Sequence, residues 1–158
     1  KGDLTPARYD VKISKQDYED WDYTFHVNEG KTRARDYVIL FLAEPVAMDV
    51  SEEEVNSLSM LVEQWPPKGL DIVGGEIWFN DVYITRFSSD IKAASWHTDL
   101  KHILLQVDNK ILVMEPDGAN MVDLVELSSS DPSEFIVLNN GTELLYRDGE
   151  EVKKVRIQ

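Results

Sequence analysis

The sequence has no cysteine among its 158 residues. That absence excludes disulfide bonds, thiolate catalysis and cysteine-ligated zinc or iron sites. It is compatible with a reducing compartment, and we expect the chain to be cytoplasmic. Because the sequence begins with Lys1 rather than with methionine, we also expect that its N-terminus has been processed or trimmed.

Basic residues are scarce as well. The chain has 16 lysines and arginines against 30 aspartates and glutamates, which gives a formal charge of -14 at pH 7. Binding to duplex DNA or to an anionic membrane depends on basic side chains that displace counterions or contact acidic headgroups. Direct contact with nucleic acid or with a membrane is therefore not expected, and the charge favours a basic protein as partner.

Long hydrophobic runs are missing. The longest apolar stretch, residues 37–43, has seven residues, whereas a membrane-spanning helix needs ~20. Hydrophobic residues nevertheless make up 42% of the chain, which is typical of a folded protein with a core. A length of 158 residues lies within the ~100 to 200 residues of one domain, so we expect a single globular domain over residues 1–158.

Motifs for nucleophilic catalysis and for phosphate binding are absent. The sequence has no G-x-S-x-G motif, and Gly74-Gly75 belongs neither to a P-loop nor to a dinucleotide fingerprint. His97 and His102 lie five residues apart with Asp99 between them, which matches neither the spacing of one helix face nor that of one strand face. A hydrolase centred on these three residues is a lesser alternative, and neither a cofactor nor a metal ion is expected.

Apolar periodicity predicts the first elements. Residues 8–14 and 22–28 alternate between apolar and polar, which predicts two strands that each bury one face. The nearly continuous apolar segment 36–43 predicts a central strand covered on both faces. Residues 51–65 predict the one clear helix, because a capping box of Ser51 and Glu54 precedes an apolar stripe. The stripe consists of Val55, Leu58, Leu61 or Val62, and Trp65.

Turn dipeptides dominate the C-terminal part of the chain. Asp108-Asn109, Asn140-Gly141 and Asp148-Gly149 each separate two strand-like runs, and such pairs adopt the positive φ angles of two-residue hairpin turns at low cost. The expected fold class is α+β, mainly antiparallel β-sheet with one α-helix and a C-terminal β-meander. The sheet is expected to be curved, or folded into a two-layer sandwich or a partial barrel.

The remaining signal is a combination of carboxylates and aromatic rings. Carboxylates speed the encounter with a basic partner, and aromatic anchors supply much of the affinity. Alternatively, the rings lie in the core and the acids only solubilise the fold. The spacing does not fit a calcium-binding EF-hand. The candidate partner-binding residues are Asp17, Tyr18, Glu19, Asp20, Trp21 and Asp22, with Glu52, Glu53 and Glu54 at the start of the predicted helix.

These observations favour a non-catalytic acidic protein-binding module, most concretely an immunity or inhibitor-type protein that occludes a basic partner such as a nuclease toxin. Nuclease clefts are positive because their substrates are polyanions, so an inhibitor gains from complementary carboxylates. The alternative is a β-rich assembly or carbohydrate or other ligand-binding module, as in phage or secretion machinery, in which Trp78 or Trp96 stacks on a ligand. Exposed sheet edges would favour self-association.

Overall fold

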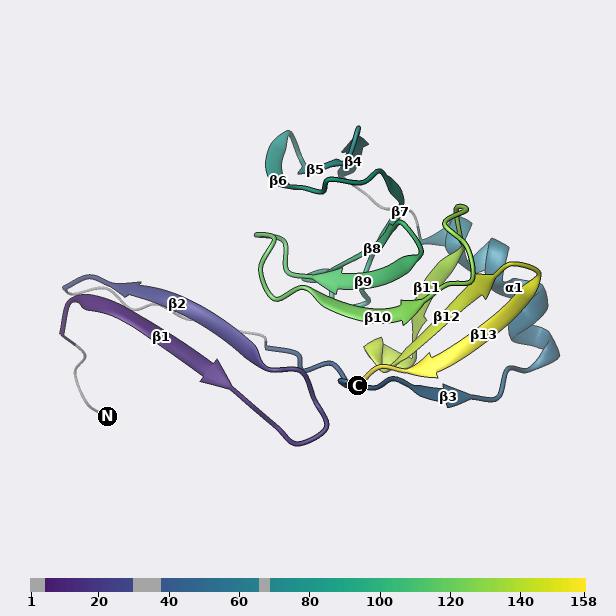
Figure 1. The fold of residues 1–158 in the computed structure, drawn as a ribbon, viewed down its shortest axis with the longest axis horizontal. Helices are drawn as coiled ribbons and strands as arrows, with labels where there is room; N and C mark the ends of the chain where they lie inside the picture. Colours follow the sequence, from purple (N-terminus) through teal and green to yellow (C-terminus); the bar gives the residue numbers. More distant parts are fainter. Residues whose placement is uncertain (1–4, 30–37, 66–68) are drawn as a thin grey trace.

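A computed structural model describes residues 5–29, 38–65 and 69–158 of the protein. These residues form mainly antiparallel strands, with one α-helix (Figure 1). The predicted α+β class is confirmed. Within the described residues, no helix has the length and apolar character needed to cross a bilayer.

Two four-stranded sheets form the centre of the molecule. The first has the strand order β10-β9-β8-β7, with β7 at Ile91–Trp96, β8 at Ile103–Val107, β9 at Lys110–Met114 and β10 at Val122–Glu126. The second has the order β11-β12-β13-β3, with β3 at Val46–Met48, β11 at Phe135–Leu138, β12 at Glu143–Asp148 and β13 at Glu151–Arg156. Strands β11, β12 and β13 are the predicted C-terminal meander.

The two central sheets pack face to face over one core, as predicted for a two-layer sandwich. Leu104 and Val113 from the first sheet share this core with Leu144 and Val155 from the second. Each sheet is also covered on its outer face. Helix α1 (Glu52–Gln64) covers the second sheet through Leu58, and a three-stranded sheet covers the first. Its strands are β4 (Leu70–Val73), β5 (Glu76–Phe79) and β6 (Val82–Arg86). These four layers are called the body below.

Strands with two covered faces have continuous apolar sequences. Leu104 and Leu105 are neighbours on β8 and point to opposite faces, yet both are buried, because one faces the second sheet and the other faces β4–β6. The prediction of a central strand at 36–43 is wrong for the described part. Residues 38–43 form only an isolated bridge, between Tyr18 and Leu42, although Phe41 and Leu42 are buried. A continuous run of apolar residues indicates that the segment is buried, but it does not by itself distinguish a strand from buried coil.

Helix α1 follows its prediction closely. The Ser51 side chain accepts a hydrogen bond from the Glu54 N–H, and the Glu54 carboxylate accepts one from the Ser51 N–H, so the capping box is confirmed. The predicted stripe is wrong at its first residue, because Val55 is 42% exposed. Only Leu58 is fully buried among the described residues of the helix, and the stripe is therefore narrower than the sequence suggests.

The predicted turn at Asp108-Asn109 is present, and Asp108 has the expected positive φ angle of 51°. The turn predicted at Asp148-Gly149 lies one residue later, at Gly149-Glu150, because Asp148 still pairs with Glu151; Gly149 has a positive φ angle of 64°. The prediction of a two-residue turn at Asn140-Gly141 is wrong, because Asn139–Gly141 forms a short 3-10 segment with φ angles of 49°, 57° and 99°. Gly141 lies against the His97 ring, where a Cβ atom would come within 2.5 Å of Cε1. Only glycine fits this close approach.

Strands β1 (Ala7–Ile13) and β2 (Trp21–Val27) form a hairpin that projects from the body (Figure 1); we call it the arm. Ile13 pairs with Trp21 at the turn end and Ala7 with Val27 at the far end. Both predicted strands are confirmed, but the expectation that each buries one face is wrong. Val11 and Ile13 are each 38% exposed, and only Trp21 at the turn end is buried.

Candidate functional site

We call residues 17–22 the acidic turn; it comprises the last part of the connection between β1 and β2 and the first two residues of β2, at the end of the arm that meets the body. Its backbone is bonded to the segment that follows the arm. The Ala43 N–H donates to the Asp17 carbonyl at 3.1 Å, and the Glu19 N–H donates to the Phe41 carbonyl at 2.9 Å. Because Phe41 belongs to the sandwich core, the acidic turn is held to the body even though the arm projects from it.

The structure places Trp21 beneath the acidic turn rather than on its surface. Its side chain is 3% exposed, and its indole N–H donates to Glu115 Oε1 at 2.7 Å. The neighbouring Asp22 N–H donates to Asn120 Oδ1 at 3.1 Å, which ties the turn to the β9–β10 connection. A buried tryptophan with its N–H satisfied is a structural anchor, so Trp21 fixes the turn from inside.

The four carboxylates of the acidic turn all lie on the surface. Lys12 pairs with Asp20 at 2.5 Å, and this hydrogen bond lowers the pKa of the Asp20 carboxyl. The Lys15 ammonium lies 3.7 Å from the centroid of the half-buried Tyr18 ring. The other three carboxylates form no ion pair within the described parts of the chain; they belong to Asp17, Glu19 and Asp22.

The structure does not bring the second acidic group next to the acidic turn. Glu52, Glu53 and Glu54 lie at the start of α1, and the acidic turn lies beyond the opposite end of β3 (Figure 1). Glu52 and Glu53 are exposed, whereas Glu54 accepts hydrogen bonds from Ser51 and from the Lys154 ammonium at 2.8 Å. The bond from Lys154 lowers the pKa of Glu54. Glu54 therefore caps the helix and joins it to β13.

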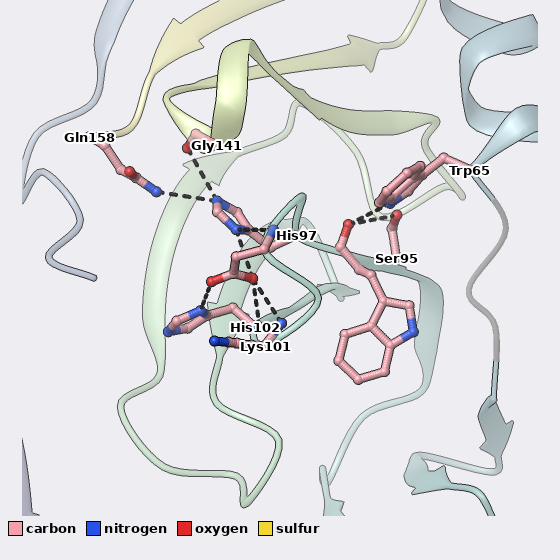
Figure 2. Close-up of polar contacts among 9 residues, drawn as sticks. Trp65, Ser95, His97, Lys101, His102, Gly141 and Gln158 are labelled. Atoms are coloured by element: carbon pink, nitrogen blue, oxygen red, sulfur yellow. Dashed lines mark hydrogen bonds and ion pairs between the residues drawn. The ribbon is translucent and has the colours of Figure 1, made fainter. Parts of the chain in front are cut away.

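The histidine cluster, His97, Asp99 and His102, lies in the turn between β7 and β8. Both imidazoles point their Nδ1 atoms at one carboxylate (Figure 2). His97 Nδ1 lies 3.0 Å from Asp99 Oδ1, and His102 Nδ1 lies 2.6 Å from Asp99 Oδ2. Asp99 Oδ1 also accepts from the N–H groups of Lys101 and His102. The turn therefore brings together three residues whose spacing fits neither a helix nor a strand.

The histidine cluster is buried and strongly polar. His97 is 1% exposed and His102 3% exposed. Burial alone would raise the pKa of Asp99, but the hydrogen bonds from His102, His97 and the Lys101 N–H outweigh burial and hold that pKa well below its ordinary range. Asp99 is therefore ionised at neutral pH. On its other side, His97 Nε2 lies 3.2 Å from the Gly141 carbonyl and 3.2 Å from Gln158 Nε2.

The space beside the histidine cluster is small. A cavity of about 10 Å³ lies between the acidic turn and the cluster, which is room for one water molecule. An organic substrate does not fit in this cavity. The cavity is lined by Glu19, Asp20, Trp21, Ile39, Phe41, His102, Asn120 and Val122.

The two tryptophans considered for ligand stacking do not line one groove. Trp96 is 6% exposed and packs edge to face on Phe79, with ring centroids 5.1 Å apart. Trp78 is half-buried and packs edge to face on Tyr83, while its N–H donates to Glu76. Trp96 is thus a core residue, and Trp78 and Tyr83 form a small aromatic pair on the outer sheet.

The structure also has a larger cavity, of about 180 Å³, which almost nothing in the sequence predicts. It lies between the segment after β10 and the β12–β13 turn. Gln106, which is fully buried on β8, shapes the segment by donating to the Asp131 carbonyl and accepting from the Ser133 N–H, each at 2.7 Å. A glutamine inside an apolar strand is the only signal that the sequence carries for it. The lining residues are Leu127, Ser129, Asp131, Pro132, Ser133, Arg147, Asp148 and Gly149.

Comparisons with protein-family models, with curated proteins and with solved structures find no match to this chain.

Proposed function

We propose that this chain is a non-catalytic acidic protein-binding module, an immunity or inhibitor-type protein that occludes a basic partner such as a nuclease toxin. The observation that carries the proposal is the acidic turn. Its carboxylates are exposed, and its backbone is hydrogen-bonded to the body at Asp17 and Glu19. A surface that is ordered before binding loses less conformational entropy when the complex forms.

The charge of the chain supports a basic partner. A net charge of -14 attracts a positive protein over a distance and raises the association rate. The exposed apolar side chains of Val11 and Ile13 lie on the arm next to the acidic turn. In this proposal the carboxylates steer the encounter, and the apolar residues of the arm contribute buried contact area. The absence of cysteine suits an inhibitor that acts in a reducing cytoplasm.

The proposal is tested by a native pull-down from the source cell, eluted with a salt gradient. The intact chain is compared with an acidic-turn variant, Asp17→Asn/Glu19→Gln/Asp22→Asn. A control variant removes three exposed carboxylates elsewhere, Glu63→Gln/Asp71→Asn/Glu150→Gln. We expect one stoichiometric basic protein that salt releases, retained by the control and lost by the acidic-turn variant. Equal recovery with both variants would contradict the proposal.

A second candidate is a β-rich assembly module, which the arm favours. An exposed hairpin whose edges are unpaired within the described residues is a template for pairing with another chain. Sedimentation of the intact chain over a range of concentrations separates the two candidates. Self-association that Val11→Lys abolishes would favour assembly, and a monomer at all concentrations would leave the binding module as the better account.

A further inference from the structure

His97 has two ways to satisfy its ring nitrogens. A neutral imidazole carries one N–H; if Nδ1 carries it, Nδ1 donates to Asp99 and Nε2 accepts from the Gln158 side chain at 3.2 Å. Nε2 lies 3.2 Å from the Gly141 carbonyl, and Nδ1 lies 3.0 Å from Asp99 Oδ1. If Nε2 carries the proton and donates to Gly141, the Nδ1 lone pair faces a carboxylate. The Asp99 N–H, at 3.3 Å from Nδ1, satisfies that lone pair only in part.

In the tautomer with the proton on Nε2, a cation between Nδ1 and the carboxylate satisfies both of these atoms. We propose that His97, Asp99 and His102 bind one divalent transition-metal ion, with Zn²⁺ as the probe, through both Nδ1 atoms and a carboxylate oxygen. The three ligand atoms lie within 4.8 Å of one another. Two imidazole nitrogens and one carboxylate oxygen form a ligand set that suits zinc and similar ions.

The residues around the histidine cluster support this assignment. A histidine that binds a metal usually donates its other N–H to a carbonyl or carboxylate, which fixes the ring. The Gly141 carbonyl is placed to accept from His97 Nε2, and the close packing of Gly141 on the ring holds its orientation (Figure 2). The buried position of both histidines keeps the ring nitrogens away from bulk water.

Metal binding requires a small rearrangement. Ligand atoms bound to zinc at about 2.0 to 2.2 Å in a tetrahedron lie about 3.3 to 3.6 Å apart. The distances from Asp99 to His97 Nδ1, 3.0 Å, and to His102 Nδ1, 2.6 Å, must therefore both lengthen, the second by more. The Asp99 side chain is 21% exposed, which gives the ion a route in and leaves room for water as a further ligand. Metal binding at this site does not depend on whether the acidic turn binds a partner.

The first test is calorimetric titration of the chelator-treated full chain with ZnCl₂. We expect one equivalent to bind, and His102→Gln to weaken binding at least tenfold. The matched control is His26→Ala, which removes the exposed histidine of β2 and should leave binding unchanged. No saturable binding, or equal binding by His102→Gln and the intact chain, would overturn the proposal. The tautomer with the proton on Nδ1, which needs no ion, would then account for these contacts.

A second measurement decides the matter if His102→Gln does not fold. The intact chain is titrated with Co²⁺, and the visible absorption of the ion reports its coordination. Intense bands of four-coordinate Co²⁺ that saturate at one equivalent and vanish when Zn²⁺ is added support the site. The weak spectrum of hydrated Co²⁺ throughout the titration contradicts it. Bound Zn²⁺ should also raise the midpoint of thermal unfolding, because the unfolded chain does not hold the three ligands together.

Discussion

The arm and the body are built from strands of similar length, yet they differ in what covers them. Strand β1 has seven residues and exposes Val11 and Ile13, whereas β8 has five and buries four of them. The body covers β8 with a sheet on each face, and the arm pairs β1 with β2 alone among the described strands. Stability should therefore reside in the body, and the arm should be available for contacts.

The largest expected effect comes from a cavity in the body. Leu104 is 1% exposed between the two central sheets, so Leu104→Ala should lower the free energy of unfolding by about 2 to 5 kcal/mol. Val11→Ala on the arm removes a partly exposed side chain and should lower it by less than ~1 kcal/mol. Urea denaturation measures both. Similar losses for the two variants would mean that the arm folds as part of the core.

The close packing of Gly141 on His97 gives the next largest effect. Gly141→Ala places a methyl group 2.5 Å from His97 Cε1 and forces a side chain into a φ of 99°. We expect a loss of about 2 to 4 kcal/mol from overpacking and backbone strain together. Gly74→Ala is the control, because its φ is also positive but nothing lies within 4 Å; it should cost about 1 kcal/mol. Equal costs would rule out the contact with His97.

Trp21 joins the arm to the body, so its substitution tests the boundary between them. Trp21→Phe keeps the apolar ring but removes the N–H that donates to Glu115 at 2.7 Å. A loss of about 1 to 3 kcal/mol is expected, because a buried carboxylate loses a donor. Phe25→Leu, farther out on the arm, should cost less than ~1 kcal/mol. If thermal and urea unfolding rank these two variants in the reverse order, Trp21 is not the anchor.

Acid should weaken the body through carboxyls whose pKa is lowered in the folded state. The Lys153 ammonium, with help from Ser128, lowers the pKa of Asp148 to about 2, and the pKa of Asp99 is also lowered. The unfolded chain then binds more protons than the folded chain between about pH 4 and pH 2, so stability is present above about pH 4 and is lost as pH falls through this range.

Asp148→Asn should therefore flatten the dependence of the unfolding free energy on pH below about pH 4. Asp10→Asn on the arm is the control. The hydrogen bonds from Thr24 and Arg8 lower the pKa of Asp10, but Asp10 is exposed, and solvent screens its interactions. Denaturation curves at pH 5, 4 and 3 measure the effect. A steeper change with Asp10→Asn than with Asp148→Asn would contradict this assignment.

Local features of the fold could be predicted from the sequence. The capping box at Ser51 and the turns at Asp108 and Gly149 depend on a few neighbouring residues, and the structure has all three, with the turn at Gly149 one residue later than predicted. The alternation of apolar and polar residues also identified both strands of the arm, but such a pattern indicates only which residues share a face of the strand. Whether another element covers that face depends on the tertiary fold, and so the exposure of Val11 did not follow from the sequence.

The acidic turn and the histidine cluster also differ in how much of each could be predicted from the sequence. The carboxylates of the acidic turn could be recognised because four of them lie within six residues, but Trp21 could not be assigned to the interior without Glu115, which lies 94 residues away. The spacing rules for helices and strands did not predict the histidine cluster, because a turn joins His97 to His102. The His97 N–H closes this turn by donating to the His102 carbonyl. Turns obey neither the helical nor the strand period.

The central claim is that the acidic turn is ordered with the body rather than with the arm, and hydrogen–deuterium exchange of the intact chain tests it most directly. The amides of Glu19 and Ala43, which donate to Phe41 and Asp17, should exchange as slowly as amides of the body. Amides at the far end of the arm, near Ala7 and Val27, should exchange faster. If Glu19 and Ala43 exchange as fast as the far end of the arm, the acidic turn is not preorganised and the account fails.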